Sequence, residues 1–141
     1  PWERQRYWAT MPGPILDRID LFVAVPRVEF AALSQPAAPD ETTAAARERV
    51  LVARRQQAYR FRHEPVTTNA EMGRWQLERY CRLDPEARAL LAEAYDRLHL
   101  SVRAHDRVLR VARTIADLEA SPRITAEHVA EALAFRMPAL F

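Results

Sequence analysis

The sequence predicts a mainly α-helical protein, with a bundle of four or five helices that follows a single apolar strand. Helix start signals and apolar residues at helical spacing recur throughout the second half of the chain. Earlier in the chain, residues 19–25 form a short apolar run that Pro26 ends, a pattern typical of a buried strand. No internal repeat is visible.

Bulk composition describes an ordinary globular domain. The chain has 141 residues, enough for about one domain with a core, and 49% of them are hydrophobic. All 21 basic side chains are arginine, but the net charge is only +2, which favours a solvated mixed-charge surface over a nucleic-acid patch. The single cysteine, Cys81, rules out an internal disulfide and predicts a reducing, cytoplasmic setting. Apolar runs are too short to predict a membrane span or a membrane partner.

Several short elements are expected in the first third of the chain. Residues 2–10 can form a short helix that the Pro-Gly-Pro sequence at 12–14 ends, and residues 15–18 can form one helical turn. The strand at 19–25 follows. Residues 31–43 are rich in alanine and proline and lack periodicity, which predicts a loop.

Helices are expected over most of the remainder. Asp40 or Thr42 can cap a helix that runs to about Phe61, with a solvated arginine face. A short helix is expected over residues 69–82.

The last three helices have clear start signals. Asp84, followed by proline and glutamate, predicts a helix that reaches about Leu98. Ser101 is expected to cap a helix that ends at Glu119 or Ala120, and Thr125 to cap the last one.

The helix that begins at Ser101 carries the first candidate site residue, Arg103. On a helical wheel, Arg103, Arg107 and Arg110 lie opposite a broad apolar arc. That arc is formed by Val108, Leu109, Val111, Ala112, Ile115 and Leu118. A guanidinium in the first turn, beside unpaired backbone N–H groups, favours a bound phosphate. The alternative is a solvent-exposed arginine that pairs with a neighbouring acid.

Arg18 is the second candidate. It stands between Asp17 and Asp20, so one interpretation is an ion-paired loop arginine. The other is an arginine finger, which a turn at the end of a core strand projects onto a neighbouring subunit's nucleotide to neutralise charge on the γ-phosphoryl group.

Other chemistry-bearing residues favour structural roles. The four histidines are scattered over different elements, and they predict no metal site. Cys81 is interpreted as a small buried side chain rather than a nucleophile. Trp2, Tyr7, Trp8 and Trp75 could stack on bases, but packing in a core or interface is the favoured interpretation.

Several blocks of sequence, in the right order, resemble magnesium-chelatase-like AAA+ ATPases. These blocks are 13–21 (GPILDRIDL), 80–84 (YCRLD), 101–118 (SVRAHDRVLRVARTIADL) and 124–133 (ITAEHVAEAL). The resemblance is closest to the bacterial ComM-type branch of this family. It covers nearly the whole chain and is weak only over residues 29–68.

The resemblance implies an architecture and roles for the two arginines. Residues 1–28 would be the C-terminal remnant of the α/β AAA+ core, including its last strand, and residues 29–141 would be the helical lid. Arg18 would be the arginine finger, acting in trans, and Arg103 the second sensor, on a phosphate of ATP. The full-length protein would be a ring-forming ATPase, expected as a hexamer, with ATP and Mg²⁺ as cofactors.

Two branches of the family imply different work: DNA unwinding or branch migration for ComM-type proteins, and magnesium insertion into a porphyrin for the chelatase subunit. This chain has two glycines and no lysine, so it cannot build the phosphate loop G-x-x-x-x-G-K-[ST], and a Walker B segment is also missing.

We therefore expect it to sense nucleotide and couple subunits, not to hydrolyse ATP alone or to carry a bound cofactor. Its expected partners are its own AAA+ core, identical subunits in a ring and DNA. The alternative is a free-standing helical interaction or DNA-binding module without ATPase activity.

Overall fold

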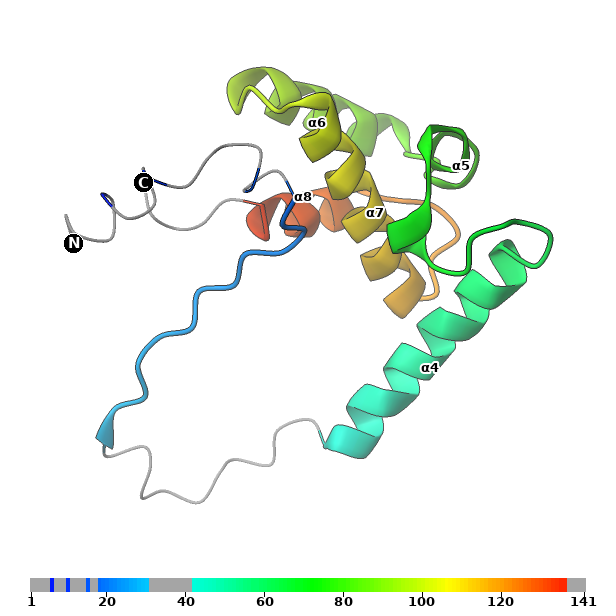
Figure 1. Ribbon diagram of the computed structural model, residues 1–141, viewed down its shortest axis with the longest axis horizontal. Coiled ribbons are helices and arrows are strands. Elements are labelled where there is room, and N and C mark those ends of the chain that lie inside the picture. Colours follow the sequence, from blue (N-terminus) through cyan, green and yellow to red (C-terminus); the bar gives the residue numbers. More distant parts are fainter. Residues whose placement is uncertain (1–5, 7–9, 11–14, 16–17, 31–41, 137–141) are drawn as a thin grey trace.

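The computed structural model describes residues 6, 10, 15, 18–30 and 42–136, and its architecture is helical (Figure 1). Within these residues the elements are α4 (Thr43–Arg60), the 3-10 helix η1 (Asn69–Glu71), α5 (Arg74–Tyr80), α6 (Pro85–Arg97), α7 (Val102–Leu118) and α8 (Ala126–Ala134). The predicted fold class, a mainly α bundle of four or five helices, is confirmed.

Three predicted helix caps are confirmed by their hydrogen bonds. Each side chain accepts from the backbone N–H three residues later: Thr42 at 3.2 Å, Asp84 at 2.7 Å and Ser101 at 3.1 Å. These bonds satisfy donors that a helix start otherwise leaves unpaired, so the sequence sets where α4, α6 and α7 begin.

The C-terminal ends of α6 and α7 share one unusual geometry. His99 and Ala120 adopt positive φ angles of 47° and 54°. Just beyond them, Leu100 N donates to Tyr95 O at 3.1 Å, and Ser121 N makes the equivalent bond at 2.7 Å. This is the Schellman motif, in which the left-handed position is usually glycine. Both helices are therefore closed by a residue that is unusual at that position.

The core surrounds α7, which contacts α4, η1, α5 and α8. Four of the six residues in the predicted apolar arc are buried, and Val111 and Leu118 are half-buried. A parallel β-bridge between Leu83 and Ile124 joins the chain before α6 to the chain before α8. Ile124 is fully buried, so this bridge fixes both helix starts against the core.

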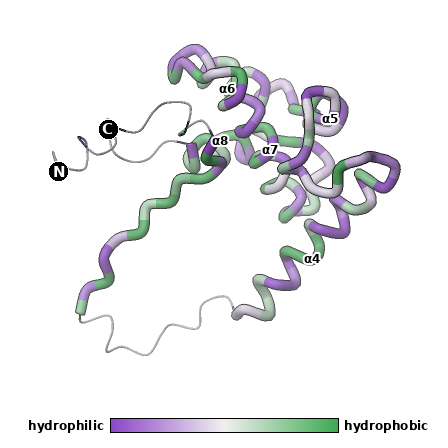
Figure 2. The backbone as a smooth tube through the Cα atoms, in the orientation of Figure 1, coloured by the Kyte–Doolittle hydropathy of each residue, from purple (hydrophilic) through white to green (hydrophobic). Residues whose placement is uncertain are grey.

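The strand expected at residues 19–25 does not form. This segment is extended but belongs to no strand, and Leu21, Val23 and Val25 are 51%, 66% and 84% exposed. Figure 2 shows it as an apolar stretch that runs away from the helices. A strand requires a neighbour for its N–H and C=O groups, and the described part of the chain places none beside it.

Within the described part of the chain, Asp20 and Phe22 attach this segment to the helical bundle. Phe22 N donates to Phe135 O at 2.7 Å, and the carboxylate of Asp20 forms an ion pair with Arg107 of α7. The segment that contains Arg18 is thereby held against α7.

Some expectations fall outside the described residues, namely the short helix at 2–10 and most of the loop at 31–43. The domain boundary between residues 28 and 29 stays a prediction. Among the helices that the structure describes, none has the length and apolar character needed to cross a membrane.

Candidate functional site

Arg103 is exposed in the first turn of α7, as the helical wheel predicted. Its side chain makes no hydrogen bond or ion pair with the described residues. The first turn of α7 carries no acidic side chain, and the Ser101 hydroxyl accepts from the N–H of Ala104. Helix starts attract anions through unpaired N–H groups and the helix dipole, so this corner of the bundle can bind an anionic group.

Arg107 and Arg110, which the wheel placed beside Arg103, are engaged within the protein. Arg107 is half-buried in its ion pair with Asp20. Arg110 donates from Nε and Nη2 to the carbonyl oxygen of Met72, at 3.1 and 2.7 Å. Of the three predicted outward arginines, Arg103 is therefore the one that remains exposed.

Arg18 is also exposed, and its backbone N–H donates to Ile15 O at 2.9 Å. The middle of the helical turn predicted at residues 15–18, residues 16 and 17, lies outside the described residues. Arg107 lies one helical turn after Arg103, so its pair with Asp20 brings the segment that carries Arg18 to the helix that carries Arg103.

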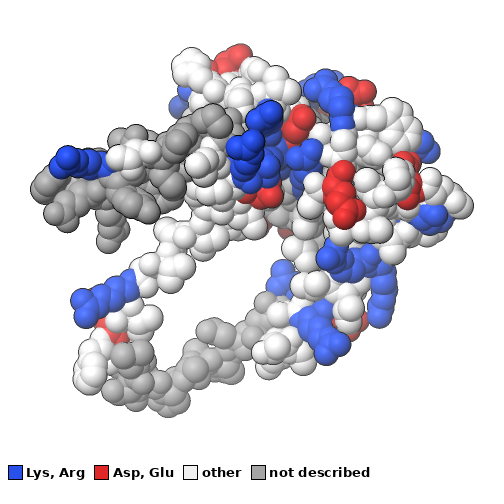
Figure 3. Space-filling view, in the orientation of Figure 1, with Lys and Arg blue, Asp and Glu red and all other residues white. Residues whose placement is uncertain are grey.

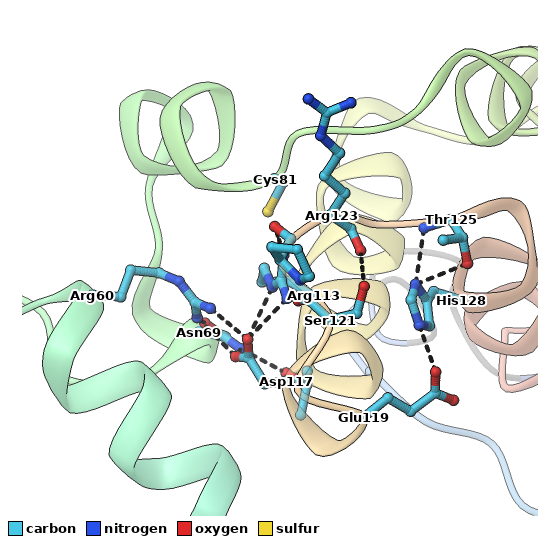
Figure 4. Close-up of polar contacts among 12 residues, drawn as sticks. Arg60, Asn69, Cys81, Arg113, Asp117, Glu119, Ser121, Arg123, Thr125 and His128 are labelled. Carbon is cyan, nitrogen blue, oxygen red and sulfur yellow. Dashed lines mark hydrogen bonds and ion pairs between the residues drawn. The ribbon is translucent and has the colours of Figure 1, made fainter.

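A buried polar cluster lies at the other end of α7 (Figure 4), and sequence reasoning missed it. Its centre is the carboxylate of Asp117, which is 1% exposed. This carboxylate accepts from Arg60 Nη1 at 2.7 Å, from Arg113 Nε at 3.0 Å and from Asn69 Nδ2 at 2.8 Å. One side chain of α7 is thus bonded to α4, to η1 and to its own helix.

Two guanidinium groups face this single carboxylate, so backbone carbonyl oxygens accept hydrogen bonds from the remaining N–H groups of Arg113. Arg113 donates to the carbonyls of Ser121 at 2.5 Å and Pro122 at 3.2 Å. Burial lowers the pKa of Arg113 because it disfavours the charged form, and the nearby Asp117 opposes that shift. No buried side-chain nitrogen or oxygen in the described residues lacks a hydrogen-bond partner. The cluster therefore fixes α7 against α4 and against the turn that leads to α8.

His128 provides a second polar link between α7 and α8 (Figure 4). It is buried, its Nδ1 accepts from the backbone N–H of Thr125 at 2.8 Å, and its Nε2 lies 2.9 Å from Glu119 Oε2. Because Nδ1 is the acceptor, Nε2 carries the proton and donates to Glu119. The histidine therefore caps α8 from within and ties it to the end of α7.

The remaining candidate, Cys81, is a buried free thiol, as the sequence indicated. Burial raises its pKa to about 12, which disfavours the nucleophilic thiolate. Among the described residues, no three His, Cys, Asp or Glu side chains are grouped as metal ligands.

The described residues form a helical bundle around a central capped helix, with an exposed arginine at that helix's start, and this architecture is consistent with a helical lid bundle. Residues 40–136 match the family described as "Magnesium chelatase, subunit ChlI C-terminal", and the chain belongs to this family. It corresponds to the C-terminal region of a magnesium-chelatase-like protein of the ComM and YifB type.

Curated relatives agree with this assignment. The chain is 39% identical to Competence protein ComM of Haemophilus influenzae over 136 residues, which are 96% of this chain and 26% of that protein. It is 36% identical to an uncharacterised protein, YifB, of Escherichia coli over the same shares. An uncharacterised protein of Mycobacterium tuberculosis is 41% identical over 94% of this chain and 26% of its own length. The chain thus spans about a quarter of the length of these relatives.

Proposed function

We propose that this chain is the nucleotide-sensing and subunit-coupling lid of a ring-forming AAA+ ATPase. In this proposal Arg103 contacts a phosphate of ATP bound to the protein's own AAA+ core. Arg18 acts as the arginine finger on the ATP of the next subunit. Mg²⁺ and the remaining phosphate contacts belong to the core.

The exposed position of Arg103 carries the proposal. The side chain is placed at a helix start that favours anions, on a helix whose other end is fixed by the Asp117 cluster. A phosphate is the anion that such a helix start and a guanidinium recognise together. Rigid attachment of α7 would let a contact at its start move the whole lid, which is what subunit coupling requires.

The work of the assembled ring is proposed to be remodelling of DNA, as in ComM-type proteins, and not magnesium insertion. The supporting observation is the 39% identity with a competence protein. The alternative, a free-standing helical interaction or DNA-binding module without ATPase activity, predicts that Arg103 has no effect on ATP turnover.

The test is an Arg103→Ala substitution in the full-length protein. We expect a folded protein whose ATP turnover falls by about 10²–10³-fold, because the substitution removes one donor to developing phosphate charge. Steady-state ATP hydrolysis and circular dichroism measure the two properties.

Arg97→Ala is the matched control. Arg97 is an exposed arginine at the end of α6, and within the described part of the chain its one ion pair is with exposed Glu93. Its loss should leave ATP turnover unchanged. Wild-type turnover in a folded Arg103→Ala protein would contradict the sensor role.

A further inference from the structure

Aromatic and basic side chains alternate on one exposed surface where the end of α4 meets α5. We call it the arginine–aromatic surface, and it comprises Tyr59, Arg62, Trp75, Arg79 and Tyr80. Tyr59 is 69% exposed and Trp75 is 52% exposed, which are large fractions for aromatic side chains. Trp75 therefore lies outside the core, and its packing at an interface stays a prediction.

Each arginine of this surface lies over a ring. The Arg62 guanidinium lies 4.2 Å from the centre of the Tyr59 ring and donates to the Tyr59 carbonyl at 2.7 Å. Arg79 lies 4.9 Å from the Trp75 ring and 5.3 Å from the Tyr80 ring. Stacking orders the arginines while leaving their N–H donors available to a ligand.

The aromatic rings of this surface are held in place by packing and by a hydrogen bond. Tyr80 packs edge-to-face against both Trp75 and buried Phe61, and its hydroxyl donates to Glu64 at 2.7 Å. This hydrogen bond raises the pKa of Tyr80. The arginine–aromatic surface is therefore pre-organised, which lowers the entropy lost when a ligand binds.

The surface borders a concavity of about 550 Å³ whose charge balance favours anions. Glu64, the carboxylate in its lining, is already bonded to Tyr80, and Arg60 is bonded to Asp117. Arg62 and Arg79 form no ion pair with the described residues. The adjoining helix α4 contains five arginines and one glutamate, and Figure 3 shows the basic side chains gathered over it.

We propose that the arginine–aromatic surface binds single-stranded nucleic acid, with Tyr59 and Trp75 stacking on bases and Arg62 and Arg79 binding phosphates. Stacking platforms combined with a basic track are the recurrent way in which proteins hold single strands. A duplex would hide its bases from the rings. An acidic peptide would use the arginines but would give the exposed rings no partner. The inference extends the proposed action on DNA but needs neither ATP nor the ring.

The experiment uses the 141-residue chain and a labelled oligothymidylate of about 20 nucleotides, longer than the ~4–16-nucleotide sites of known single-strand modules. Fluorescence anisotropy at low salt should report binding that exceeds binding of a duplex of equal length. Trp75→Ala should weaken it by about 5- to 100-fold, because one stacked base is lost. Trp75→Phe, which keeps a ring, should retain most of the affinity.

Two further variants separate charge from stacking. Arg79→Ala should weaken binding and lower the salt dependence by about 0.7 in the log–log slope, the value for one lost phosphate contact. Arg97→Ala removes an exposed arginine from α6 and should change neither property.

Absence of binding by the wild-type chain would overturn the proposal. Three other results would also overturn it, because each would mean that the rings do not contact bases. These are tighter binding to the duplex than to the single strand, a folded Trp75→Ala variant with wild-type affinity, and competition by polyglutamate as strong as competition by unlabelled oligothymidylate. In the full-length protein Arg103→Ala should lower ATP turnover, whereas in the 141-residue chain it should leave the affinity for oligothymidylate at the wild-type level. The binding surface and the proposed sensor can therefore fail independently.

Discussion

Arg113 and Asp117 are charged side chains in the interior, 2% and 1% exposed. Burying their charges costs free energy, and the hydrogen bonds of the complete cluster offset that cost. Asp117→Ala would leave two guanidinium groups facing no carboxylate. We expect the free energy of unfolding to fall by about 3–5 kcal/mol, the usual cost of breaking a buried pair from one side. Urea denaturation followed by circular dichroism measures it.

Glu93→Ala is the control for this substitution, because it removes a carboxylate from an exposed ion pair with Arg97. The change there should stay within about 0.5 kcal/mol. A similar small effect for Asp117→Ala would mean that water or other side chains replace the carboxylate, and that the cluster does not fix α7.

Cys81 should be unreactive in the native chain. Its pKa is raised to about 12 by burial, so the folded thiol stays protonated while the thiol of the unfolded chain ionises near its ordinary value of 9.0. Ionisation therefore favours the unfolded state, and stability should fall as the pH rises from about 9 to about 12. Thiol labelling at pH 8 should be slow in buffer and fast in urea; fast labelling of the native chain would show that Cys81 is accessible.

At the scale of elements, helix starts were predictable because each is encoded within four residues. Thr42, Asp84 and Ser101 are acceptors placed directly before a helical sequence, and all three cap as expected. The strand at 19–25 was not predictable, because strand formation depends on a neighbour that local sequence does not specify. Its apolar pattern indicated burial, yet most of its side chains are exposed.

The Asp117 cluster was missed for a different reason. A helical wheel assumes one buried face, but α4 and η1 also reach α7 near its C-terminal end, where Arg60 bonds to Asp117 and Asn69 bonds to Thr114. The partner of Asp117, Arg60, lies 57 residues earlier in the chain, and one sequence cannot reveal such a pairing. The spacing of Arg113 and Asp117, four apart on one helix, was the available signal.

Ile115 tests the face of α7 that the wheel did identify. It is 7% exposed within the core, so Ile115→Ala should lower the free energy of unfolding by about 2–5 kcal/mol. Arg103→Ala, on the exposed face of the same helix, should be nearly neutral. The denaturant midpoints of the two variants measure this difference in stability. Equal midpoints would contradict the placement of Ile115 in the core and of Arg103 on the exposed face.

At the scale of the whole molecule, Arg18 should act across a subunit boundary. In the full-length protein, Arg18→Ala should bind ATP normally and hydrolyse it slowly, because an arginine finger stabilises charge that develops during transfer. Mixing it with a subunit defective in its own phosphate loop should restore part of the activity, since some interfaces then pair an intact finger with an intact loop. ATP turnover over a series of mixing ratios measures the recovery.

No recovery at any ratio, in rings shown to be mixed, would contradict action in trans. The family assignment would be unaffected, because it rests on the match over residues 40–136 and not on Arg18.

His99 and Ala120, the left-handed residues that end α6 and α7, are positions where a substitution could make this protein more heat-resistant. Ala120 holds a φ of 54°, a conformation that costs an L-residue with a Cβ atom roughly 1–2 kcal/mol and costs glycine little. After subtracting the greater freedom of glycine in the unfolded chain, Ala120→Gly should raise stability by about 0.5–1 kcal/mol. Differential scanning calorimetry should record a higher Tm, whereas a lower Tm would show that the end of α7 gains more from the Ala120 side chain than its backbone loses. Glycine at Ala120 and at His99, which has a φ of 47°, would therefore be two stabilising substitutions that leave Arg103 unchanged.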